Sequence, residues 1–479
     1  MLMRYRTTAV SAAALFFAVL FVPVGSAKDN FPASSGESLS AELARHARTL
    51  ADDDMTGRGV DTPGIVKARD YIAAEFKKAG LAAGGDQGFF QRLEITTGVE
   101  IAGENAARLG DKPLELGRDW TPLGLSASES AQGELVFAGY GITATGHDYD
   151  DYAGIDAKGK IVVVLRYEPP PKSEESPFGK APRSSRYAAL SAKAGNARAH
   201  GAAGMVLVDL EAQPGAAEMI PLRRSMGRGE DGLVAIQASR EAAERTLGHA
   251  GISLSELKTR IDAEEKPHSR ALSGLNAALT VHLEKIARPS DNVVSVLRGS
   301  DSVLKDEVIV VGAHYDHLGF GHYGTMDRGG EGQIHHGADD NASGTAVMLS
   351  LAARFARSRP APARTLVFVA FTGEELGLYG SRHFVAHPPF PIASIKAMIN
   401  LDMVGRMQNN RLSVNSADTA KEFRAMIAAA AGGVDIEMKA TGGGSDHVSF
   451  FTQGVPAIHF YTGMHGDYHR PSDTSDKLN

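Results

Sequence analysis

From Asn292 onward, short continuous apolar runs alternate with segments of helical periodicity. Runs that are apolar at every position suit strands that are covered on both faces of a sheet. The alternation predicts a three-layer α/β/α sandwich with a mixed, mostly parallel sheet. The clearest runs are VIVV, TLVFVAF and KAMINL, and helices are expected at 343–357, 375–386 and 421–431.

Between Gly133 and Leu272 the pattern changes to short β-runs separated by glycines, such as ELVFAGY and KIVVVLRY. This stretch has few helical patterns and no cluster of metal-binding residue types, which indicates an inserted β-rich domain. The expected organisation is a signal peptide at 1–27, the first part of the main domain at 28–120, the insert at 121–272 and the second part, with the site, at 273–479.

The N-terminus has the pattern of a secretory signal peptide. Arg4 and Arg6 precede an apolar run that ends in Gly25-Ser26-Ala27, so cleavage is expected after Ala27. An uncleaved anchor is the alternative, but the run is short for a bilayer span of ~20 residues. The chain has no cysteine, which excludes disulfides, thiolate ligands and a lipoprotein anchor. These features predict a secreted or periplasmic protein without a membrane span after cleavage.

The charge balance argues against a nucleic-acid partner. The chain has 50 Lys and Arg against 57 Asp and Glu, a net charge of −7, and no basic block. Phosphate binding requires a clustered positive surface. We therefore expect no nucleic-acid binding.

Histidine is concentrated in the second half of the chain, where 11 of 17 lie between His314 and His469. Most of the segments that carry histidine or carboxylate there follow predicted strands, and ligands of open α/β sheets bind outside the carboxyl ends of the strands. The five segments are GAHYDH at 312–317, GADDNASG at 337–344, TGEE at 372–375, NLDM at 400–403 and HGDYHRPSD at 465–473.

This inventory of side chains fits two divalent cations. Zinc accepts imidazole and carboxylate ligands, and two ions ~3.5–4 Å apart need a bridging carboxylate. The prediction is two Zn²⁺ ions, although other divalent ions accept the same residue types. His314, Asp339 and Asp402 are assigned to one ion, and Asp339, Glu375 and His469 to the other. Asp339 is thus the bridging ligand, and one hydroxide balances the remaining charge.

Two further carboxylates have expected catalytic roles. Glu374 neighbours a ligand but is not one, so it is assigned as the general base that takes a proton from water and passes it to the leaving amine. Asp316 is expected to hold the other ring nitrogen of His314.

Other polar residues near these motifs receive structural interpretations. Asp446 is expected to cap a helix, and Tyr461 either contacts the tetrahedral intermediate or lies buried in a strand. Four histidines are expected to be solvated loop residues, and two residues are expected to brace the His469 loop. They are His317, His322, His335 and His336, and Arg470 and Asp473, respectively.

The segments GAHYDH, GADDNASG, TGEELGLYGS, NLDM and DYHRPSD resemble, in order, those of the M28 family of zinc aminopeptidases. The earlier segment GRGVDTPG is similar to that family too, and the strand-rich insert resembles a protease-associated (PA) domain. The resemblance implies a fold of the zinc exopeptidase type, with the predicted ligands, base and orienting acid on the family's positions. It also implies a strained or cis peptide between Asp339 and Asp340. Similar members usually continue into a further helix after the last motif, whereas this chain stops at Asn479.

The favoured hypothesis is a secreted di-zinc exopeptidase that hydrolyses the N-terminal bond of peptides with a free N-terminus, using a metal-bridging hydroxide. A carboxypeptidase or dipeptidase of the same scaffold is the main alternative. A glutaminyl cyclase, which uses one zinc ion, and a non-catalytic receptor-like relative are the others; the full set of ligand positions argues against both.

Overall fold

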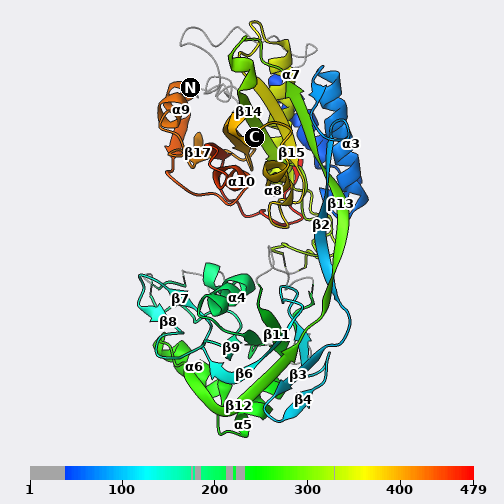
Figure 1. Cartoon of the computed structure of the whole chain (residues 1–479). Helices are drawn as coiled ribbons and strands as arrows, with labels where there is room; N and C mark the ends of the chain where they lie inside the picture. Colours follow the sequence, from blue (N-terminus) through cyan, green and yellow to red (C-terminus); the bar gives the residue numbers. More distant parts are fainter. Residues whose placement is uncertain (1–37, 174–175, 179–184, 212–218, 223–231, 328) are drawn as a thin grey trace, which may run out of the picture. The chain divides into compact units, whose positions relative to one another are not determined.

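The computed structural model describes residues 38–173, 176–178, 185–211, 219–222, 232–327 and 329–479. The predicted signal peptide, 1–27, lies outside them. The chain forms two compact units, which are called unit 1 and unit 2 (Figure 1). Unit 1 combines the segment up to Thr97 with Ala287–Asn479, and unit 2 is Gly98–Ile286. Among the helices in the described ranges, none is both long enough and apolar enough to cross a membrane.

Unit 1 is built on a nine-stranded mixed sheet with the order β1-β13-β15-β14-β16-β19-β17-β18 and with β2 paired to β13. The central strand β14 runs parallel to β15 and β16, and β16 runs parallel to β19. Every residue of β14 and β15 is buried, as their continuous apolar runs predict. The strands are β1 Ala82–Ala83, β2 Phe90–Ile101, β13 Leu283–Leu297, β14 Val308–His314, β15 Thr365–Phe371, β16 Ile395–Leu401, β17 Arg411–Asn415, β18 Asp435–Met438 and β19 Ala457–Tyr461.

Helices cover both faces of this sheet. One core joins α2, α3, α7 and α9 to the face that carries Ile309 and Val311 of β14. A second core joins α8 and α10 to the opposite face, which carries Val308 and Val310. The predicted three-layer α/β/α sandwich is confirmed. The helices are α2 Leu39–Leu50, α3 Pro63–Lys78, α7 Gly344–Arg357, α8 Tyr379–Ala386, α9 Phe423–Ala430 and α10 His447–Phe451.

The helix expected from Glu375 begins only at Tyr379. Gly377 and Leu378 have φ values of 124° and 61°, which are incompatible with a right-handed helix. The peptide N–H groups of both residues donate to the carbonyl oxygen of Glu374. Glu374 and Glu375 therefore lie in a turn at the end of β15, not on a helix.

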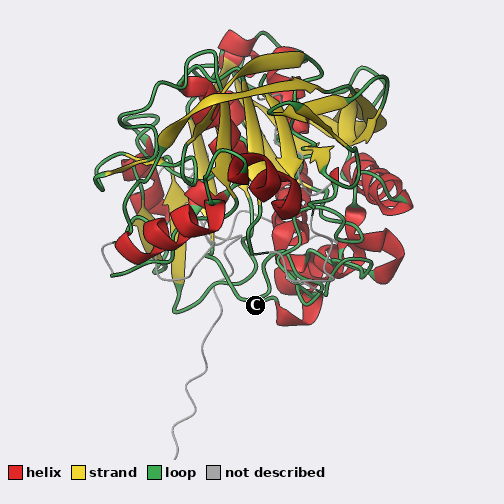
Figure 2. Ribbon diagram, turned by 90° about the horizontal axis from the view of Figure 1, so that it is seen from below, coloured by secondary structure: helices red, strands yellow, loops and turns green. Residues whose placement is uncertain are grey.

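Unit 2 is β-rich, as expected for the insert. Figure 2 distinguishes the helices and strands of the whole chain by colour. Its main sheet has eight strands in the order β4-β3-β12-β6-β9-β10-β11-β5, and β7 pairs with β8. The unit is longer than the expected 121–272, because β3 and β4 precede that range and join the sheet through β12. Its elements are β3 Ala106–Leu109, β4 Lys112–Leu114, β5 Trp120–Pro122, β6 Ser130–Phe137, β7 Thr143–Ala144, β8 Tyr149–Asp150, β9 Ile161–Leu165, β10 Gly204–Val208, β11 Val234–Ala238, β12 Arg270–Thr280, α4 Leu190–Ala199, α5 Arg240–Gly248 and α6 Leu254–Glu264.

Candidate metal centre

The carboxyl ends of three neighbouring parallel strands meet at one edge of the unit 1 sheet. His314 is the last residue of β14, Glu374 and Glu375 follow β15, and Asp402 follows β16. The sequence places the same residues at strand ends, and the sheet order brings them together. His469 reaches the same place from the C-terminal loop, where its ring contacts Glu375.

Two groups of side chains share the carboxylate of Asp340. In the first group, His314 Nε2 lies 3.3 Å from Asp340 Oδ1 and 3.4 Å from Asp402 Oδ1. In the second group, His469 Nε2 lies 3.2 Å from Asp340 Oδ2 and 3.1 Å from Glu375 Oε2. Each oxygen of Asp340 therefore faces a different group, which is the arrangement of a bridging ligand.

These four distances fit tetrahedral zinc coordination. Bonds of about 2.0–2.1 Å at tetrahedral angles place two ligand atoms about 3.3 Å apart. Among the described residues, His469 Nε2 and Asp402 Oδ1 are buried atoms without a hydrogen-bond partner, as expected of atoms that bind an ion. The imidazole and carboxylate donors and their spacing therefore fit two zinc ions.

The structure places Asp340, not the predicted Asp339, between the two groups. Asp339 Oδ2 lies 3.2 Å from His465 Nε2, and Asp339 Oδ1 accepts a hydrogen bond of 2.7 Å from the Gly405 N–H. The cis peptide is also one residue later than the resemblance implied, between Asp340 and Asn341. In the irregular turn Ala338–Ser343, successive aspartates point to different surroundings, and Asp340 is the one that faces the site.

Asp473 holds this turn in place. Its Oδ2 accepts hydrogen bonds from the N–H groups of Asp339, at 3.0 Å, and Asp340, at 3.1 Å. Asp473 was expected to brace the His469 loop. The structure shows that it ties this loop to the Asp340 turn, so the two segments that carry the second group are fixed to each other.

Asp316 acts mainly on the turn after β15. Its carboxylate accepts hydrogen bonds from the N–H groups of Glu374, at 3.1 Å, and Glu375, at 3.4 Å. His314 Nδ1 lies 3.1 Å from the carbonyl oxygen of Asp316 and 3.7 Å from its carboxylate. The expected contact between Asp316 and His314 is thus made by the backbone, while the carboxylate positions the two glutamates.

Burial and neighbouring histidines act in opposite directions on the acids of this site, and the histidines lower the pKa values of Asp340, Glu375 and Asp402. Burial raises the pKa of Glu374 well above its usual range; the carboxylates of Glu375 and Asp402 add to this, and the imidazole of His314 opposes it. Burial also raises the pKa of Asp316 and of Asp446 to about 7. So many buried acids in one place create a strong demand for cations.

Two histidines expected to be solvated are buried instead. His317 has no exposed surface, and its Nδ1 lies 2.7 Å from Glu375 Oε1. His335 is also fully buried, with Nε2 2.8 Å from the Thr325 hydroxyl. His322 and His336 are half-buried. The sequence signal that was missed is the position of His317 in the chain. It lies shortly after His314, the last residue of β14, and so at the same edge of the sheet as the site.

Asp446 occupies the N-cap position of α10, as predicted, but it does not cap the helix with its side chain. That side chain is fully buried. Beside it, the rings of His447 and His459 stack 4.9 Å apart, and burial lowers the pKa of His447 to about 3. Tyr461, half-buried, lies 5.7 Å from His459, measured between ring centroids. The uncharged rings of His447, His459 and Tyr461 therefore lie next to the part of the site that contains Asp402.

Arg58 is a fully buried cation beneath the centre. Its guanidinium donates hydrogen bonds to the carbonyl oxygens of Leu50, Tyr315, His336 and Gly337, at 2.5–2.8 Å. Burial lowers the pKa of Arg58 to about 10, against the opposing effect of Asp340 and other nearby acids. It therefore remains charged at neutral pH and joins the loops that follow β14 and precede Asp340.

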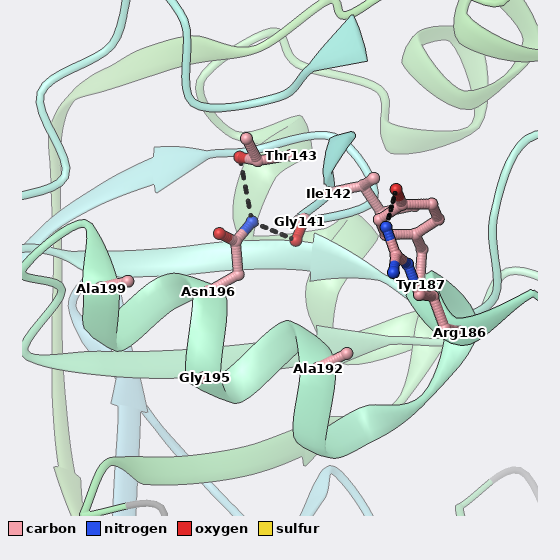
Figure 3. A pocket seen from close by; sticks show the side chains of 9 residues that line it. All are labelled: Gly141, Ile142, Thr143, Arg186, Tyr187, Ala192, Gly195, Asn196 and Ala199. Atoms are coloured by element: carbon pink, nitrogen blue, oxygen red, sulfur yellow. Dashed lines mark hydrogen bonds between the residues drawn. The ribbon is translucent and has the colours of Figure 1, made fainter. Parts of the chain in front are cut away.

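A pocket in unit 2 has a different character. It has a volume of about 450 Å³ and lies between α4 and the Gly141–Thr143 segment (Figure 3). The described residues of its lining are mostly small or apolar, and Arg186 is the one charged side chain among them. Asn196 is already bonded to the Gly141 carbonyl oxygen and the Thr143 hydroxyl. Among the described residues that line it, none supplies a carboxylate or an imidazole for metal chemistry.

Comparison with known families agrees with the two-unit organisation. Residues 292–479 match Peptidase family M28, and residues 131–246 match the PA domain. The C-terminal part of the chain is thus similar to peptidase family M28 and the insert to the PA domain, in agreement with the resemblance of the motifs.

Three similar proteins illustrate the relationship. Aminopeptidase YwaD of Bacillus subtilis is 31% identical over 201 residues, which are 40% of each chain. A probable zinc metalloprotease of Pyrenophora teres is 41% identical over 113 residues, 24% of this chain and 22% of the relative. The chain thus matches less than half of the length of these relatives. A solved aminopeptidase structure from Aneurinibacillus shares the fold, with a TM-score of 0.51, 22% identity and coverage of 92% and 89% of the two chains.

The contacts of Arg58 predict a large stability effect. Arg58→Met should destabilise unit 1 by roughly 3 kcal/mol or more, because several buried carbonyl oxygens lose a charged donor. Arg58→Lys should lie between Met and wild type, since lysine keeps the charge but not the planar fork. Denaturant unfolding measures the free energy of unfolding of both variants.

Arg298→Met is the control. Arg298 is an exposed residue of unit 1 that pairs with Asp306, so its loss should cost under about 0.5 kcal/mol. Equal effects of Arg58→Met and Arg298→Met would contradict the analysis.

Proposed function

We propose that this protein is a two-zinc exopeptidase that removes N-terminal residues from peptides. The observation that carries the proposal is the Asp340 carboxylate between two His-carboxylate groups at tetrahedral spacing. The proposed ligands are His314, Asp340 and Asp402 for the first ion, and Asp340, Glu375 and His469 for the second. Other divalent ions can occupy such sites.

Zinc in this centre would polarise the scissile carbonyl and lower the pKa of water. The chain's own contribution is proton transfer by Glu374. Burial raises the pKa of Glu374, which makes its carboxylate a stronger base, as suits a group that accepts a proton from the attacking water and returns it to the leaving amine. Asp316 positions Glu374, because its carboxylate accepts a hydrogen bond from the Glu374 backbone N–H.

The proposal of N-terminal cleavage is supported by the names of the relatives, an aminopeptidase and a probable zinc metalloprotease. The basic and apolar N-terminus supports export to the periplasm or the medium. Carboxypeptidase or dipeptidase activity remains the alternative, because both would use the same centre on a different end of the substrate.

Aminoacyl-p-nitroanilides with free and acetylated α-amines distinguish these activities. We expect hydrolysis only of substrates with a free amine, loss of activity on chelation, and recovery when zinc is returned. The alternative, carboxypeptidase or dipeptidase activity, would be established by a folded protein with two zinc ions that cleaves no aminoacyl-p-nitroanilide but does cleave C-terminal substrates or dipeptides. Inactivity on every substrate would favour a non-catalytic relative.

Substitution of each aspartate tests which one bridges. Asp340→Asn should remove both ions and all activity, because an amide has one oxygen and no charge to share between two cations. Asp339→Asn should keep two ions, since the Asp339 carboxylate faces His465 and Gly405. Zinc per chain, measured by mass spectrometry after dialysis, decides the question. Retention by Asp340→Asn with loss by Asp339→Asn would restore the assignment made from the sequence.

Glu374→Gln tests the general base. The amide preserves shape but cannot accept the proton, so kcat should fall about 10²–10⁴-fold, with KM changed little and two zinc ions retained. Steady-state kinetics and metal analysis on the same sample give both values. Undiminished kcat would exclude Glu374 as the base.

A further inference from the structure

We propose that His317 is a positioning residue that fixes Glu375 for metal binding without itself coordinating the ion. This inference rests on the proposed function, because it concerns the second of the two metal groups. It assigns a role to the second histidine of the GAHYDH segment, for which the sequence predicts only a solvated loop residue.

The distances around Glu375 distinguish a proposed metal ligand, His469, from a supporting residue, His317. His469 Nε2 is 3.1 Å from Glu375 Oε2 and 3.2 Å from Asp340 Oδ2, so it fits the about 3.3 Å expected between two ligands of one ion. His317, Asp340 and Glu375 also lie close enough together to hold an ion. However, His317 Nδ1 is 2.7 Å from Glu375 Oε1, which is hydrogen-bond distance and shorter than the tetrahedral spacing, and 3.8 Å from Asp340 Oδ2, which is longer than that spacing. These two distances therefore fit a hydrogen bond better than a shared ion.

Glu375 thus uses its two oxygens differently. Oε1 accepts the hydrogen bond from His317, and Oε2 faces His469 and the proposed ion. Because a carboxylate can only accept, the hydrogen of the neutral His317 ring must sit on Nδ1. Hydrogen bonds of this kind orient ligating carboxylates and typically change metal affinity or activity 10–100-fold.

The surroundings of His317 hold its ring in this orientation. The backbone N–H of His317 donates to the Arg58 carbonyl oxygen at 3.2 Å, and the backbone carbonyl oxygen of His317 accepts from the Tyr323 hydroxyl at 3.0 Å. Gly337, at φ 56°, lies against the ring so closely that a Cβ there would be 2.5 Å from two ring carbons. The ring of His469 meets it edge-on at 5.7 Å. A ring confined on these sides keeps Nδ1 directed at Glu375.

Asn and Gln substitutions separate the hydrogen bond from ring packing. An Asn amide nitrogen falls near the position of the imidazole Nδ1, whereas a Gln amide nitrogen falls near Nε2. His317→Asn should therefore bind the second zinc within a few-fold of wild type. His317→Gln and His317→Ala should bind it about 10–100-fold more weakly and keep the first ion. Competition with a chromophoric zinc chelator measures both affinities, and kcat and KM are measured on the same samples.

His46→Asn is the matched control. His46 is another buried histidine of unit 1, on α2, whose Nδ1 lies 2.7 Å from the Tyr71 hydroxyl. Its substitution should lower stability without changing zinc affinity, and thermal melts of all variants show that they fold.

Four results would overturn the proposal. The first is second-zinc affinity within three-fold of wild type in all His317 variants. The second is an equal loss in His317→Asn and His317→Gln, which would mean that the Nδ1 donor is not what matters. The third is one fewer zinc-bound imidazole per chain by X-ray absorption in His317→Gln loaded with two zinc ions, which would make His317 a ligand. The fourth is a wild-type protein that binds fewer than two ions, and this result alone would also overturn the proposed function.

Discussion

Burial of several carboxylates beside one another is the constraint on which the rest of unit 1 depends. Asp340, Glu374 and Glu375 are each less than 10% exposed and lie within one cluster. Like charges repel strongly where water is excluded, so such a cluster must bind cations or take up protons. Burial raises the pKa of Glu374 well above its usual range, and repulsion from the carboxylates of Glu375 and Asp402 adds to this. Two divalent cations would relieve this repulsion.

Most of the proposed ligands are fixed by a second contact, and much of this support comes from backbone groups. His314 Nδ1 contacts the Asp316 carbonyl oxygen, and His469 Nδ1 contacts that of Gly324 at 2.8 Å. The Asp340 turn is held through its N–H groups by Asp473. The Glu375 carboxylate differs from these, because it is itself held by another side chain, that of His317. Substitution can remove this support without rebuilding a loop.

The fold and the strand-end location of the site were predictable, because both follow from local patterns. Continuous apolar runs define β14 and β15, and polar residues that follow parallel strands must meet at one edge. The choice between Asp339 and Asp340 was not predictable from spacing. Both belong to one short motif, and the irregular backbone of Ala338–Ser343 decides which carboxylate turns inward.

His317 and Asp446 were missed for a related reason. Histidine and aspartate in loops are usually solvated or capping residues, and nothing in their local sequence signals burial. Burial arises here from distant segments: Gly337 closes over the His317 ring, and α10 packs against α8 beside Asp446. Such contacts exist only once the whole unit has formed.

The N-terminal segment contributes no proposed ligand, yet the centre depends on it. Arg58 lies before the insert and donates to carbonyl oxygens on both sides of the site, at Tyr315 and Gly337. Helices α2 and α3, from the same segment, complete the core on one face of the sheet. The region that matches Peptidase family M28 begins only at residue 292. Without the N-terminal segment, that region would expose the sheet face and leave buried carbonyl oxygens without their donor. The folding unit is therefore larger than the region that matches the family. The insert separates its two segments in the sequence, but the two segments form one compact unit.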